Sequence, residues 1–243
     1  GFILSAAGSA IGLGAIWKFP YTAGTNGGAV FFLLFLLFTI LIALPVQLAE
    51  FYIGRKSGKN AVDAFKVLAP DTLWPWVGRM GVFACFILLS FYSVVGGWVL
   101  NYVVHAFDGS IRAGADFEAL FGNTIASPVG SVAYQGLFML MTVWVVKSGI
   151  SSGIEKANRY MMPALFILFL LLAGRSLTLP DAMAGVSFLL KPDWSHLSPQ
   201  TMLTALGQAF FALSIGVSTM ITYAAYLDRK QDLFRSGHSI MWM

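Results

Sequence analysis

Residues 8–14 read Gly-Ser-Ala-Ile-Gly-Leu-Gly and place three glycines in a short part of an otherwise apolar stretch. Each glycine lacks the Cβ atom that favours the helical region and costs about 1 kcal/mol relative to alanine inside a helix. The stretch therefore predicts a helix that unwinds and frees backbone N–H and C=O groups. In a membrane, such groups are tolerated only where they are buried in protein or line a polar cavity, and there they can bind ions or charged ligands. The alternative is close helix packing, because Gly8 and Gly12 also form a GxxxG pair.

The composition places the chain among membrane proteins. Hydrophobic residues make up 58% of it and charged residues only 11%, and the mean hydropathy is +0.76. A chain this apolar is not water-soluble. The net charge of +4 fits the excess of Lys and Arg found in cytoplasmic loops better than it fits nucleic-acid binding. The single cysteine, Cys85, excludes a disulfide within these residues and a cysteine-based metal cluster.

Long stretches without Asp, Glu, Lys or Arg predict an all-α polytopic membrane protein. The expected spans lie near residues 2–22, 29–54, 78–107, 129–147, 157–178 and 200–227. The loops on one side carry eleven Lys and Arg residues and those on the other side carry three. The positive-inside rule then predicts a cytoplasmic N-terminus.

The sixth expected span contains a second polar interruption, Ser214-Ile-Gly-Val-Ser218. Broken helices at corresponding positions of two halves indicate a transporter site, formed where backbone groups are freed near the middle of the membrane. Spans one to five would then form the first five-helix repeat. The sixth would open the second repeat of an inverted 5+5 transporter fold, with helices 1 and 6 broken in mid-membrane.

Several motifs carry a resemblance to the neurotransmitter:sodium symporter family, bacterial branch, over its N-terminal half. They are Gly8 to Tyr21 with Asn26-Gly-Gly28, Leu44-Pro45 to Glu50 with Gly54-Arg55, Ser90 to Trp98, Gly149 to Lys156 with Met162-Pro163, and Gly207 to Tyr223. The resemblance covers essentially the whole chain except its last five residues.

The resemblance implies two sodium sites. It assigns the carbonyls of Gly8 and Ile11 to the second site, and Ala10 and Ala212 to the first. The sequence departs from the family at the first site, because Ala15 and Ala212 stand where side-chain oxygen ligands are usual. The first sodium site and the sodium stoichiometry are therefore open.

The resemblance also implies an amino acid substrate, neutral and either apolar or aromatic. Its carboxylate would meet the amides of Gly12 and Gly14 and the hydroxyl of Tyr92. Its ammonium would meet Ala10, Phe211, Ala212 and Ser214, and its side chain would meet Leu88, Phe211 and Val217. The partial positive charge at the N-terminus of a half-helix independently suits a zwitterion.

Two further substitutions alter the pattern. Phe35 lacks the hydroxyl that lines the chloride position in chloride-dependent members, which argues against chloride dependence. Lys18 replaces the arginine of the outer gate, keeping the charge but losing the bidentate fork.

Two residues leave alternatives open. Glu50 is an acid inside a predicted span, which favours a functional role, but Arg55 follows so closely that the carboxylate could also extend to the cytoplasmic interface. Pro163 follows Gly153 in a pattern that resembles one allowing the fifth helix to unwind in family members, and it could equally be an ordinary kink.

The resemblance implies a sodium-coupled amino acid symporter that works by alternating access, and no enzyme. Sodium would be co-transported, and no organic cofactor is expected. The expected partners are the substrate and the lipid bilayer, with no nucleic acid, in the plasma membrane or in the inner membrane of a Gram-negative source. The alternative is a truncated, non-transporting membrane fragment or scaffold. The identity of the amino acid and the oligomeric state stay open.

Overall fold

The computed structural model describes residues 8, 11–12, 14–112, 114–149, 153–227 and 231–242. Within these residues the chain is helical and contains no β-strand. Four described helices are long and apolar enough to cross a membrane. They are the continuous helix Ala29–Ser57, α6 (Pro75–Phe107), α8 (Pro128–Lys147) and α9 (Glu155–Leu177).

Shorter helices lie at the first and sixth predicted spans and between the long helices. At the first span they are the π-helical turn η1 (Gly14–Lys18) and α2 (Phe19–Thr25), and at the sixth they are α11 (Pro199–Ala212) and α12 (Thr219–Ala225). The others are α5 (Ala61–Leu68), α7 (Phe117–Ala126), α10 (Ala182–Leu190), the 3₁₀ turn η4 (Trp194–His196) and α13 (Leu233–Trp242).

The chain divides into two compact units. The first comprises residues 1–82 and 155–243, and the second comprises residues 83–154. Helix α6 begins in the first unit and continues through the second.

The first unit is built on the helix Ala29–Ser57, which consists of α3 (Ala29–Phe38), the π-helical turn η2 (Thr39–Ala43) and α4 (Leu44–Ser57). Pro45 explains the irregular turn, because its ring lacks an N–H and collides with the carbonyl four residues earlier, that of Leu41. A π-helical turn widens the helix locally and so accommodates that carbonyl.

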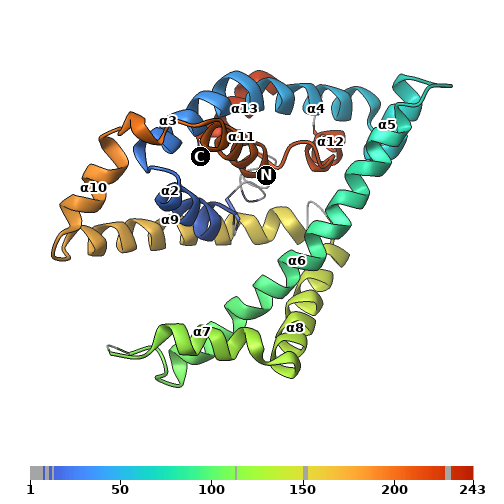
Figure 1. Ribbon diagram of the computed structural model, residues 1–243. Helices are drawn as coiled ribbons and strands as arrows, with labels where there is room; N and C mark the ends of the chain where they lie inside the picture. The colour runs from blue at the N-terminus through green and yellow to red at the C-terminus, as the bar shows by residue number, and fades with distance from the viewer. Residues whose placement is uncertain are drawn as a thin grey trace. The chain divides into compact units, whose positions relative to one another are not determined.

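Helix α4 packs on α12 and α13, and α3 packs on α11 (Figure 1). The buried α4 residues Leu44, Gln47, Glu50, Phe51 and Gly54 recur every three or four positions and so form one face. Gly54 allows the closest approach, since a Cβ atom there would collide with Ile221 and Ala224 of α12.

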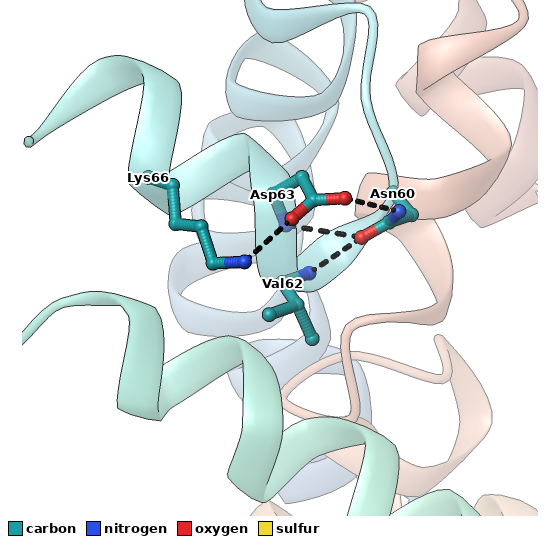
Figure 2. Close-up of polar contacts among 4 residues, drawn as sticks. All are labelled: Asn60, Val62, Asp63 and Lys66. Carbon is teal, nitrogen blue, oxygen red and sulfur yellow. Dashed lines mark hydrogen bonds and ion pairs between the residues drawn. The ribbon is translucent and has the colours of Figure 1, made fainter.

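A polar cap fixes the start of α5 (Figure 2). The Oδ1 atom of Asn60 accepts hydrogen bonds from the backbone N–H groups of Val62 and Asp63 at 3.1 and 3.0 Å. The Nδ2 atom of Asn60 donates to Asp63, and the Lys66 ammonium pairs with the same carboxylate at 2.9 Å. Hydrogen bonding from Lys66, and then from Asn60, lowers the pKa of Asp63. The cap turns the chain sharply after α4, so that Ala61, Ala64 and Phe65 pack against Ile221.

The second unit holds the rest of α6 together with α7 and α8. Ser127 caps α8 by accepting the N–H of Gly130 at 3.2 Å, and Pro128 occupies the first turn, where no N–H is needed. The indole of Trp98 packs edge-on against Phe121 of α7 and donates to Ser131 of α8 at 3.4 Å.

Candidate functional site

The second interruption separates α11 from α12. Helix α11 ends at Ala212 and α12 begins at Thr219. Three residues between them have positive φ, with values of 52° at Ser214, 81° at Gly216 and 62° at Ser218. Only glycine adopts this region without strain. The two serines must therefore be held by contacts from elsewhere in the fold.

Part of the first interruption is described. The carbonyl of Gly12 accepts the N–H groups of Ala15 and Ile16 at 3.1 and 3.2 Å, which starts the π-helical turn η1 at Gly14. Ala10, predicted at both the sodium and the substrate sites, lies outside the described residues.

Phe211, in the last turn of α11 just before the second interruption, contacts the start of η1 next to the first interruption. Its ring lies so close to Gly14 that a Cβ atom there would fall 2.6 Å from Phe211 Cδ1. The ammonium of Lys18 lies 4.8 Å from the centre of the same ring. One turn earlier on α11, Gln208 Nε2 donates to the Gly14 carbonyl at 3.5 Å. Two of the predicted substrate residues, Gly14 and Phe211, are thus in direct contact.

Glu50 braces the second interruption from α4. Its side chain is only 8% exposed, and Oε1 accepts the backbone N–H of Gly216 at 2.7 Å. Among the residues that the structure describes, the other carboxylate oxygen, Oε2, has no hydrogen-bond partner. Glu50 therefore contacts the interruption instead of extending toward solvent.

A cavity of about 230 Å³ includes Ala15 and Ala212 in its lining, the two positions at which the sequence lacks the side-chain oxygen ligands usual for the first sodium site. Its lining includes Ile11, Ala15, Phe35, Thr39 and Ala212, with Leu36, Ile40, Leu213, Ile240, Met241 and Trp242. Most of these side chains are apolar. Within the described part of the chain, the Thr39 hydroxyl has no hydrogen-bond partner. The structure thus brings Ala15 and Ala212 to one cavity, where neither offers a side-chain oxygen.

The remaining predicted residues fall in two places. Ser214 and Val217 lie within the second interruption, in the first unit. Leu88 and Tyr92 lie one turn apart on α6, in the second unit. Their place at the substrate site therefore stays a prediction.

Asn158 of α9 lies next to the first interruption and was not predicted as a site residue. A Cβ atom added to Gly8 would lie 2.8 Å from Asn158 Oδ1 and 3.0 Å from its Nδ2, so the amide packs against the predicted sodium-binding backbone. An asparagine at the start of an apolar span was the available signal. Among the residues described, no group of three or more His, Cys, Asp or Glu is placed to hold a metal ion.

Four long apolar helices among the described residues indicate a multi-pass helical membrane protein. The chain belongs to the sodium:neurotransmitter symporter family, whose model matches residues 1–114 and 119–242. The predicted family is confirmed.

Named relatives agree with this assignment. The chain is 54% identical over 245 residues to an uncharacterized sodium-dependent transporter, YhdH, of Bacillus subtilis, covering 100% of this chain and 54% of that protein. It is 36% identical to an uncharacterized sodium-dependent transporter of Haemophilus influenzae, covering 97% of this chain and 54% of that protein. The crystal structure of MhsT in complex with L-phenylalanine superposes with a TM-score of 0.93 at 45% identity, covering 99% of this chain and 55% of MhsT. The chain therefore spans about half the length of the relatives it matches.

Proposed function

We propose that the intact protein containing this chain is a sodium-coupled symporter that carries an amino acid across the plasma membrane by alternating access. The observation that carries the proposal is the contact between Gly14 and Phe211, which flank the two helix interruptions, in a chain of this family. The helix ends at these interruptions would present their dipoles to an ion and to a zwitterionic substrate, and no covalent step is needed.

The proposed architecture is the first five-helix repeat and the sixth helix of an inverted 5+5 fold. Helices 1 and 6 would break in mid-membrane at the two interruptions, and the N-terminus would lie in the cytoplasm. The charge difference between the loops supports this orientation.

The proposed substrate is a neutral amino acid with an apolar or aromatic side chain. Gly12, Gly14 and Tyr92 would bind its carboxylate. Ala10, Phe211, Ala212 and Ser214 would bind its ammonium, and Leu88, Phe211 and Val217 would surround its side chain. The solved complex of MhsT with L-phenylalanine supports an aromatic substrate.

The proposed coupling ion is a single sodium at the second site, bound by the carbonyls of Gly8 and Ile11. The first site, through Ala10 and Ala212, is doubtful because Ala15 and Ala212 line an apolar cavity. Sodium requires several oxygen ligands, and alanine side chains supply none.

Uptake of radiolabelled L-phenylalanine by the intact protein in proteoliposomes tests the proposal. An inward sodium gradient should drive uptake with a Hill coefficient of about one for sodium. Introducing Ala15→Asn together with Ala212→Thr should raise sodium affinity or cooperativity. Uptake that ignores sodium, or a clear two-sodium dependence of the unmodified protein, contradicts the respective part of the proposal.

Replacement of Tyr92 by Phe tests the substrate site. A hydrogen bond to a charged group contributes roughly 1.5–3 kcal/mol, so affinity should fall by at least about 10-fold. Unchanged affinity would remove Tyr92 from the site.

A further inference from the structure

The first turns of α6 belong to the first unit and pack there through two buried glycines, Gly78 and Gly81. The two glycines are three positions apart and so share one face of the helix. A Cβ atom on Gly78 would collide with the carbonyl oxygen of Ala61 and would lie 2.9 Å from the Cα of Val62, both in α5. Residues without a Cβ atom let two backbones approach this closely. The start of α6 is therefore held against its neighbours backbone to backbone.

Gly81 lies against the end of the second interruption. A Cβ atom there would collide with Ser218 Oγ and would lie 2.7 Å from Ser218 Cβ and 3.2 Å from the carbonyl carbon of Val217. Ser218 is only 6% exposed and has a positive φ of 62°. Its carbonyl accepts the N–H of Thr222 at 3.3 Å, which starts α12. The backbone of the interruption therefore lies directly on α6.

Val217 stands in the chain between two anchored residues. On one side, Gly216 donates its N–H to the Glu50 carboxylate at 2.7 Å. On the other side, Ser218 lies against Gly81. A closely packed interior transmits a displacement to the next residue because it has few voids that could absorb it. The position of Val217 is therefore set by α4 and α6 together.

We propose that Gly81 is a specificity-determining residue for the side chain of the substrate. Because Gly81 has no Cβ atom, Ser218 and Val217 lie close to α6, and the wall that Val217 contributes to the pocket stands where a large apolar or aromatic side chain fits. This inference rests on the proposed function, since it takes Val217 as part of that pocket.

The size of the substrate side chain decides how strongly a displaced wall is felt. A wall that moves by a few tenths of an ångström either loses contact with a large side chain or collides with it. A single methylene group in a hydrophobic pocket already changes discrimination by roughly 10- to 200-fold. The methyl side chain of L-alanine makes few such contacts, so its binding should depend little on the wall.

Competition against tritiated L-phenylalanine, measured in sodium with the intact, purified protein, tests the inference. The competitors are amino acids of increasing side-chain size from L-alanine to L-tryptophan. Gly81→Ala should weaken binding of the largest side chains about ten-fold and that of L-alanine less than about two-fold.

A second substitution should reverse this loss. Ser218→Gly removes the two atoms that a Cβ atom at Gly81 would approach most closely, and glycine adopts the positive φ without strain. Combined with Gly81→Ala, it should bring the binding of large amino acids to within about two-fold of the Ser218→Gly protein.

Gly174→Ala in α9 is the control, because no atom of the described residues comes within 4 Å of a Cβ atom built there. It should leave the whole series unchanged. Thermal unfolding of each variant in detergent identifies any loss of folded protein. If Gly81→Ala does not fold, its combination with Ser218→Ala keeps the test decisive, since that pair retains the close approach of the two Cβ atoms at 2.7 Å and lacks the collision with the hydroxyl.

The outcomes separate the two proposals. Equal losses across the series from Gly81→Ala would show general damage and would overturn the specificity role, as would an unchanged series or a loss that Ser218→Gly does not reverse. Val217→Ala in an otherwise unmodified protein tests the pocket wall itself. If that variant leaves the series unchanged, the proposed substrate site is wrong at Val217, and the role of Gly81 falls with it.

Discussion

The substitution Gly54→Ala tests how closely α4 must lie against α12. A Cβ atom at Gly54 would fall 2.9 Å from the Cβ of Ala224, where ordinary contact begins at 3.4 Å, and closer still to the carbonyl oxygen of Ile221. Both neighbours belong to a helix, so neither can turn aside as a flexible side chain could. Helix α12 must then move by several tenths of an ångström, and overpacking of this kind costs about 1–3 kcal/mol.

The same movement reaches the candidate site. Glu50 lies one turn before Gly54 on α4, and its carboxylate accepts the N–H of Gly216, next to the start of α12, at 2.7 Å. A hydrogen bond to a charged acceptor contributes roughly 1.5–3 kcal/mol and weakens steeply when it lengthens. We therefore expect Gly54→Ala to lower the unfolding temperature of the intact protein in detergent and to reduce sodium-dependent uptake.

Gly174→Ala is the control for that experiment. Gly174 lies in α9, and no atom of the described residues comes within 4 Å of a Cβ built there. Alanine is better than glycine in a helix by about 1 kcal/mol, so this control should be neutral or stabilising. If both substitutions have the same effect on unfolding and uptake, the close approach of α4 and α12 does not hold the interruption in place.

Three further predictions concern the interruptions. Lys18→Leu should weaken substrate binding by about two- to five-fold, because the contact of a cation with an aromatic ring contributes about 0.5–1 kcal/mol at exposed sites. Lys18→Arg should keep the cation over the Phe211 ring and so keep substrate binding. Equal substrate binding by the Leu variant and the unmodified protein would refute this. Gly8→Ala should impair sodium-dependent uptake because its methyl group would meet the Asn158 amide, and Asn158→Ala in the same protein should restore part of it; no rescue would place the defect elsewhere. Pro163→Ala restores a backbone donor inside α9 and should slow exchange while leaving equilibrium substrate binding nearly intact; parallel loss of both would leave the proline as a kink alone.

The long helices could be located from the sequence because charge is costly inside a membrane span. The predicted span 29–54 corresponds to the helix Ala29–Ser57, and 157–178 corresponds to Glu155–Leu177. The predicted and observed ends of these helices differ by three residues or fewer. They differ because a charged last turn, such as the one with Arg55 and Lys56, can continue a helix beyond its apolar part. That these helices cross a membrane in the proposed order stays a prediction.

The faces of these helices could not be predicted. A span that is apolar on every side has no clear polar stripe, so its sequence does not indicate which residues turn inward. The contacts of Asn158 with Gly8 and of Gln135 with Ser93 depend on that rotation. Glu50 shows the same limit, because its distance from Arg55 along the chain allowed both an interfacial and an internal position. Its hydrogen bond to Gly216 distinguishes them.

The second interruption is held open by tertiary contacts and not by local preference. Ser214 and Ser218 adopt positive φ, which costs an ordinary residue roughly 1–2 kcal/mol each. On either side of Ser214, Leu213 and Ile215 are both 4% exposed and belong to the same apolar cluster, so the chain is anchored before and after the strained position. The carboxylate of Glu50 then binds the N–H of Gly216. Burial of two large side chains and one hydrogen bond to a carboxylate therefore offset the strain of the backbone between α11 and α12.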